Sequence, residues 1–117
     1  MAALAKQVTV FRLLPAGDSA RPTAVAFSRD ALAKGRPGRG FHPSAIEVDP
    51  RTGHWVVLAS ADQAMAVVTA TGEVLATAEL RGRHRQPEGL AIAPDGRIFV
   101  SDEGGRGRGT VTVYDCR

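Results

Sequence analysis

The chain has 117 residues, a net charge of +3 and a single cysteine, Cys116. This length suits at most one domain, and 44% hydrophobic with 23% charged residues excludes a wholly disordered chain. One cysteine excludes an intramolecular disulfide, and no apolar run is long enough for a signal peptide or a membrane span.

The first forty residues predict two strands and one short helix. Alternating β-branched residues over 7–13 and a short apolar run over 23–27 are typical of strands. Ser28 is a suitable N-cap for a helix over 28–35, which Gly35 would end.

From residue 41 onward, short strands alternate with tight turns. Turn-forming Pro, Gly, Asp and Thr separate apolar or alternating runs. The expected strands cover residues 44–49, 54–60, 64–70, 73–80, 88–93, 97–103 and 110–116.

This second part of the chain contains an internal repeat. The stretch HPSAIEVDPRTGHWVVLAS (42–60) is matched by QPEGLAIAPDGRIFVSDE (86–103). The two prolines of each stretch align at an offset of 44 residues, and Gly53 aligns with Gly96 at an offset of 43, after one residue is lost in the turn. Four short strands per unit at this period are typical of a β-propeller blade. The alternative is a pair of unrelated meanders that share turn chemistry.

We therefore predict an all-β fold of β-propeller-like antiparallel blades, a partial propeller of about two blades with one short N-terminal helix. Residues 1–40 would supply outer strands, the short helix and the linker of a preceding blade. Residues 41–117 would form two propeller-type repeats, 43–80 and 87–116. Because propellers have at least about four blades, we expect open sheet edges that favour self-association or pairing with a missing N-terminal portion.

Basic residues gather in three glycine-rich segments, at 34–40, 81–86 and 104–109. They are either solvated loops or a phosphate-binding surface. No aromatic residues are interleaved with these arginines for base stacking, so we expect no nucleic-acid partner.

The motifs FHPSAIEVDPRTGHWVVLAS (41–60) and QPEGLAIAPDGRIFVSDEGGRG (86–107) resemble those of the bacterial SdiA-regulated family. The resemblance covers residues 41–117 well and corresponds to the C-terminal portion of such a protein. It implies a propeller whose biochemical role is largely undefined, with some members described as phytase-like or calcium-binding. It also implies export or membrane anchoring, which the absence of a signal peptide in this chain leaves open.

The candidate ligand-binding residues precede the first strand of each repeat. In a propeller this strand lines the central channel, so the residue before it lies near the channel mouth. Glu88 and its repeat mate Ser44 hold this position, and His42 and Gln86 precede them. Alternatively, Glu88 accepts backbone N–H bonds and only fixes the start of the blade.

The candidate metal-binding residues are Glu88, Asp102 and Glu103. Carboxylates that converge from different blades would suit a hard cation, so calcium is the cofactor that we would expect. The alternative is that Asp102 and Glu103 merely precede a turn. Asp95 is expected to be a turn residue as well, within the turn at 94–96. No histidine spacing supports a zinc site.

No complete catalytic constellation can be read from the sequence. It therefore favours a non-catalytic module that binds a ligand or protein partner, with calcium near the channel. One alternative is a phytase-like, metal-dependent phosphoesterase with arginines that hold phosphate. Another is an inactive fragment of a longer propeller.

Overall fold

The computed structural model describes residues 7–12, 23–33, 40–80, 86–104 and 107–115. Within these ranges the chain forms three antiparallel sheets and one helical turn. Sheet A contains β1 (Gln7–Arg12) and β2 (Thr23–Ser28), which lead into α2 (Arg29–Leu32). Sheet B contains, in order, β3 (Ala45–Val48), β4 (Trp55–Ala59), β5 (Ala64–Val68) and β6 (Val74–Glu79). Sheet C contains β7 (Pro87–Ile92), β8 (Ile98–Asp102) and β9 (Thr110–Tyr114).

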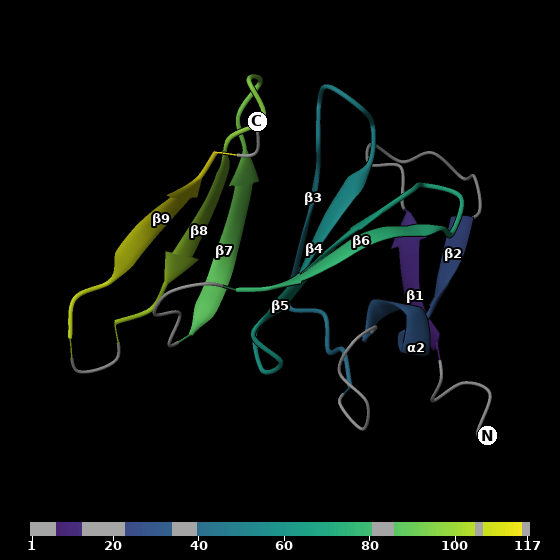
Figure 1. The fold of residues 1–117 in the computed structure, drawn as a ribbon, viewed down its shortest axis with the longest axis horizontal. Coiled ribbons are helices and arrows are strands. Elements are labelled where there is room, and N and C mark those ends of the chain that lie inside the picture. The colour runs from purple at the N-terminus through teal and green to yellow at the C-terminus, as the bar shows by residue number, and fades with distance from the viewer. Residues whose placement is uncertain (1–6, 13–22, 34–39, 81–85, 105–106, 116–117) are drawn as a thin grey trace, which may run out of the picture.

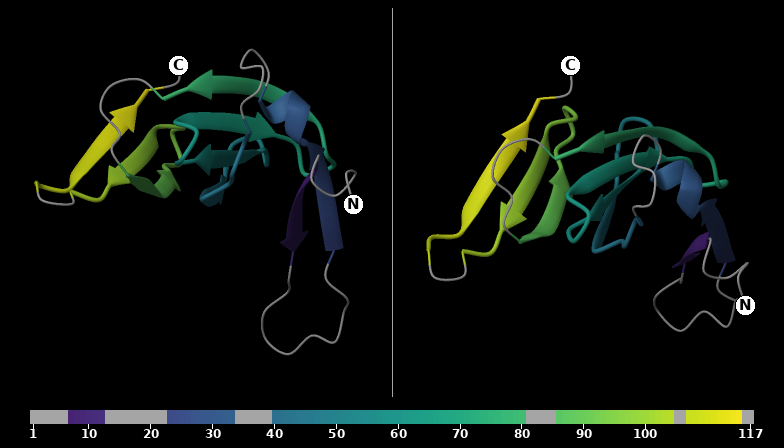
Figure 2. Two further views of the ribbon diagram at one scale, coloured as in Figure 1. Left: turned by 90° about the horizontal axis from the view of Figure 1, so that it is seen from below. Right: turned by 60° about the horizontal axis from the view of Figure 1, so that its bottom comes forward.

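The sheets succeed one another in chain order, as Figure 1 shows, with sheet B between the other two. The further views in Figure 2 show them fanned along an arc, like consecutive blades of a partial propeller. The first strands of sheets B and C, β3 and β7, lie against each other. The predicted fold class is therefore confirmed, including the short helix that follows sheet A. Among the described residues, no helix has the length and apolar character that crossing a membrane requires.

The helix follows directly from its cap. Ser28 has extended backbone angles (φ −66°, ψ 124°), and its hydroxyl accepts a hydrogen bond from the Ala31 N–H at 3.2 Å. This bond satisfies one of the N–H groups that a helix leaves open at its start. The helix ends at Leu32, whose side chain is buried. The predicted stop at Gly35 lies outside the described residues.

Strand pairing follows the same register in sheets B and C. In sheet B, Ile46 pairs with Val57, and in sheet C, Leu90 pairs with Val100. These pairs are related by the offsets of 44 and 43 residues found in the sequence. The following strands continue the match, because Met65 and Val111 occupy equivalent places beside β4 and β8. The two repeats thus share one antiparallel plan.

The core has two layers, one on each face of sheet B. On the side of sheet A and α2, one cluster of buried residues packs between the elements. In this cluster the rings of Trp55 and Phe27 contact each other edge to face, with their centroids 6.0 Å apart. Toward sheet C, Leu58 packs with Ile98 and Val100. Every residue of β4 is buried because both of its faces are covered. Full burial of such side chains contributes roughly 1.5–3 kcal/mol each, so β4 anchors the three sheets together.

The turns between the first two strands of each repeat use the same chemistry. Asp49 and Asp95 each accept the backbone N–H two residues later, at 2.9 Å from Arg51 and 3.1 Å from Arg97. A glycine follows in each turn with positive φ, +76° in the first repeat and +91° in the second. Only glycine adopts this backbone region at little cost, which explains its place in both motifs.

Candidate functional site

The candidate residues lie where the inner strands begin. Strands β3 and β7 run in the same direction in Figure 1, so their starting ends share one side of the molecule. We call this side the rim and define it by residues 40–44, 60–63, 86–88 and 103–104. These segments lie before or at the start of the first strand of a repeat, or follow its second strand. Loop positions of this kind carry side chains without burying their backbone, so they suit binding.

One polar contact at the rim joins the side chains of His42 and Asp62. The carboxylate of Asp62 accepts the His42 backbone N–H at 2.7 Å, and the ring Nδ1 lies 3.0 Å from the same oxygen. Because a carboxylate can only accept, Nδ1 carries the proton and donates it. The Asp62 side chain is 10% exposed, whereas the His42 side chain is 64% exposed. The imidazole is therefore held by one nitrogen while most of its surface faces solvent.

Ser44 is engaged within its own sheet. Its hydroxyl donates to the Leu58 carbonyl at 3.1 Å and accepts the Ser60 N–H at 3.0 Å. Its backbone N–H also donates to the Leu58 carbonyl, at 2.7 Å. These bonds extend the β3–β4 ladder by one residue beyond Ala45. Ser44 therefore fixes the start of β3, and its hydroxyl is committed to that task.

Glu88, the repeat mate of Ser44, lies in a β-bulge. Pro87 pairs with Asp102 and Gly89 pairs with Ser101, so Glu88 is the extra residue between them. Its side chain is exposed. A bulge of this kind re-aims a side chain and is frequent beside functional sites. Unlike Ser44, Glu88 has been displaced from the regular ladder, although both residues are exposed.

The bulge depends on the glycine that follows it. A Cβ atom at Gly89 would overlap the Ser101 hydroxyl oxygen and lie 3.3 Å from the Ser101 Cβ atom. In the first repeat the same pair of positions is held by Ala45 and Leu58, and the register there has no bulge. The rest of the segment is held by Gln86, whose carbonyl accepts the Glu103 N–H at 3.1 Å. Gln86 thus contributes its backbone here.

The predicted metal ligands have different surroundings. Asp102 is 7% exposed and is the buried charged residue of the described part, whereas Glu88 and Glu103 are exposed. Within the described ranges, no three His, Cys, Asp or Glu side chains come together in a group that could hold a metal ion. The described side chains therefore do not fit a complete calcium site, and calcium stays a prediction. No observation favours the phosphoesterase over a binding module.

Two acidic residues lie away from the rim, in the turns that follow β3 and β7. The backbone N–H of Arg51 lowers the pKa of Asp49, helped by the Arg51 guanidinium, whose Nη2 lies 3.5 Å from the carboxylate. The backbone N–H of Arg97 lowers the pKa of Asp95 in the same way, and the Arg97 Nε lies 2.9 Å from its Oδ2. Both carboxylates serve turns at the far ends of β3 and β7, as expected for Asp95.

Asp62 was not among the expected site residues, because the sequence indicated only a turn between the strands expected at 54–60 and 64–70. The available signal was topological, because the β4–β5 turn must lie on the same side as the start of β3. Gln63 in this turn has a positive φ of 52°, and its side chain donates to the Ser60 carbonyl at 3.0 Å. The Gln63 side chain thus holds the turn through Ser60, and the Asp62 carboxylate is in contact with His42.

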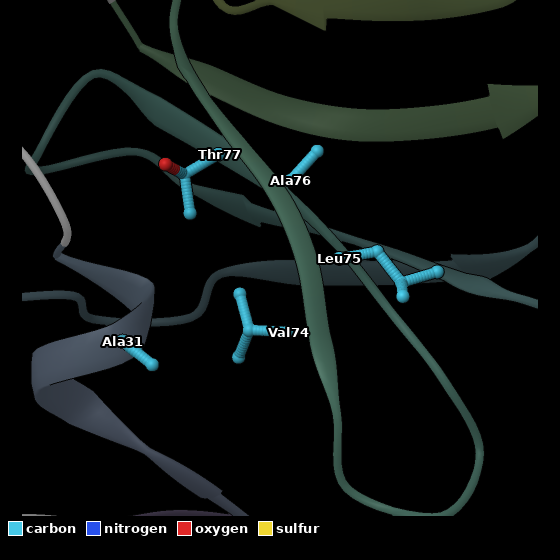
Figure 3. Close-up of a pocket in the computed structure, with 5 residues that line it drawn as sticks. All are labelled: Ala31, Val74, Leu75, Ala76 and Thr77. Atoms are coloured by element: carbon cyan, nitrogen blue, oxygen red, sulfur yellow. The ribbon is translucent and has the colours of Figure 1, made fainter.

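A hollow between α2 and β6 carries no such chemistry. It has a volume of about 490 Å³. Figure 3 shows its lining, in which the Thr77 hydroxyl is the polar side-chain group among aliphatic neighbours. Its lining residues are Ala31, Val74, Leu75, Ala76 and Thr77. None of them titrates, so the rim is the better candidate for recognition.

Comparison with known proteins gives one family. The sequence profile of a family described as SdiA-regulated matches residues 41–106, which is more than half of the chain. No curated protein and no solved structure matches the chain. The matched range contains both inner strands and every rim segment except Gly40.

Proposed function

Since this chain belongs to the SdiA-regulated family, we propose that it is a propeller-type binding module that recognises its ligand at the rim. The observation that carries the proposal is the His42–Asp62 pair. An imidazole fixed through one nitrogen and 64% exposed is preorganised for contact with a ligand. A side chain that is already fixed loses less entropy on binding than a freely rotating histidine would.

The chemistry of the rim indicates the kind of ligand. With Nδ1 donating to Asp62, the Nε2 atom of His42 is a hydrogen-bond acceptor in the neutral ring. Glu88, displaced by its bulge in the neighbouring repeat, adds a carboxylate acceptor. Two acceptors favour a ligand rich in N–H or O–H donors, or one with positive charge. The net charge of +3 opposes strongly cationic partners, so we favour an uncharged donor-rich ligand.

Calcium is a separate part of this proposal. Glu88 and Glu103 are exposed carboxylates on consecutive rim segments, and calcium prefers carboxylate and carbonyl oxygens. The described side chains alone are too few for its usual six to eight ligands. Backbone carbonyls or water would have to complete the coordination.

Chemical-shift mapping of the backbone amides tests the proposal. Sorbitol serves as an uncharged donor-rich probe, and calcium chloride is added in a separate titration. We expect one of these probes to shift His42, Asp62 and Glu88 while leaving the far turns at Arg51 and Arg97 unchanged. The variants H42A and E88Q should weaken the response. Rim amides that respond to neither probe, or no more than the far turns, would contradict the proposal.

A further inference from the structure

Gly40 lies against the imidazole ring of His42. A Cβ atom added at Gly40 would lie 2.7 Å from the ring Cε1 atom, 3.3 Å from Nδ1 and 3.4 Å from Nε2. The first of these distances is too short for any real side chain, so the ring or the chain would have to move. The φ of Gly40 is not in the left-handed region, so its backbone angles do not require a glycine. This position therefore requires the absence of a side chain.

The buried Phe41 explains why Gly40 and His42 meet. Its side chain is 0% exposed and belongs to the core cluster on the side of sheet A. The residue after His42 is Pro43, which restricts the backbone of His42 to extended angles. In an extended chain, alternate residues point to the same side. Positions 40 and 42 therefore share the side opposite the buried phenyl ring.

Asp62 holds the same imidazole through a different edge. The ring Nδ1 lies 3.0 Å from the carboxylate oxygen that also accepts the His42 backbone N–H at 2.7 Å. A side chain at position 40 would push the ring out of this place, because an exposed ring moves more easily than the backbone. Nδ1 would then separate from the carboxylate, whereas the backbone bond to Asp62 would remain.

We propose that Gly40 is a positioning residue of the rim, whose missing side chain leaves the space that the His42 imidazole needs to reach Asp62. Through this contact it keeps the proton on Nδ1 and leaves Nε2 as an acceptor. Gly40 precedes residues 41–106, so this role extends the rim beyond the range that the family profile matches. Its consequence for binding rests on the function proposed above, but the position of the ring is measurable without a ligand.

Long-range proton–nitrogen NMR spectra of the histidine rings test this inference. In the neutral ring of wild-type His42, the proton should lie on Nδ1. G40A should shift the ratio of the two neutral forms about tenfold toward protonated Nε2, because the bond to a charged carboxylate is lost. The melting temperature should stay within about 4 °C of wild type, because only an exposed ring has to move.

G107A is the matched control. Gly107 also lacks a left-handed φ, and among the described residues an added Cβ atom would have only an ordinary contact, 3.5 Å from the Gly104 carbonyl oxygen. This variant should leave the His42 ring unchanged. In the wild-type protein we also expect NOEs between the Gly40 Hα protons and the His42 Hε1 proton.

The double variant G40A/D62A tests whether Gly40 acts through the carboxylate. Once D62A has removed the carboxylate, adding G40A should change the ratio of the two ring forms little. The inference would be overturned by an unshifted ring in G40A, an equal shift in G107A, a G40A effect of full size beside D62A, or missing NOEs. Unfolding of G40A would overturn it as well, because the ring and not the backbone is expected to yield. Rim amides that respond to neither sorbitol nor calcium would instead contradict the proposed function and leave the ring measurement intact.

Discussion

Substitution of Gly89 by alanine tests the bulge that presents Glu88. The added Cβ atom would overlap the Ser101 hydroxyl oxygen. Rotation of the serine side chain can move that oxygen away, but the Ser101 Cβ atom would remain 3.3 Å from the new methyl group. Ser101 or the bulged segment would therefore have to shift by a few tenths of an ångström.

The expected cost follows from this geometry. Overpacking by one methyl group in a packed region costs about 1–3 kcal/mol. For a chain of this size, that loss corresponds to a fall in melting temperature of roughly 4–12 °C. The double variant G89A/S101G removes both Ser101 atoms that the methyl group would meet, so it should recover part of the loss. We expect a favourable coupling free energy of about 0.5–2 kcal/mol between the two changes.

Thermal unfolding followed by circular dichroism measures these differences, with E88Q as a control that leaves the backbone unchanged. E88Q should melt within about 2 °C of wild type because the side chain is exposed. If G89A is as stable as wild type, or if S101G makes its loss larger, the strands do not approach as described and the bulge argument is wrong.

Three further changes probe the core, the rim and the turns. Trp55→Ala should cost about 3–5 kcal/mol because it leaves a cavity between sheets A and B, and urea unfolding would show a much smaller loss if that layer were loose. Asp62→Ala should cost about 1–3 kcal/mol and broaden the His42 ring signals in NMR spectra, whereas an unchanged ring would show that the pair is not formed. The pKa values of Asp49 and Asp95 in the folded state lie below the ordinary value of 3.8. The hydrogen bonds of these carboxylates therefore stabilise the fold at a pH above 3.8, and this stability is lost as the pH falls through the lower folded-state pKa values. The variant D49N/D95N should therefore lose less stability than wild type between about pH 5 and about pH 3, and an equal loss in both proteins would refute this.

Much of the fold was predictable because it rests on local chemistry. The helix began at the residue expected to cap it, since the Ser28 hydroxyl needs only a neighbouring N–H. The repeat was visible because two prolines of each unit align and each turn needs a glycine with positive φ, here Gly53 and Gly96. Apolar and alternating runs between these turns then predicted where the strands lie.

The site was less predictable because it depends on contacts between distant residues. His42 and Asp62 are twenty positions apart, and only the strand register brings them together. The bulge at Glu88 had one sequence signal, the adjacent Gly89, because a glycine within a strand often marks a bulge. Nothing in the sequence specified that Ser101 would lie against this glycine. Equivalent positions therefore have different roles. Ser44 extends the β3–β4 ladder, whereas Glu88 is the extra residue of a bulge in the β7–β8 ladder.

The most direct test of this account is the pattern of backbone and side-chain NOEs across the two repeats. We expect cross-strand NOEs for Ile46 with Val57 and for Leu90 with Val100, which would establish the same register in both. We also expect side-chain NOEs between Leu58 and Val100, which would place the second repeat against the first. Pairing that is shifted by one residue in either repeat, or sheets that show no mutual NOEs, would contradict the claim that equivalent units bring their starting ends to one rim.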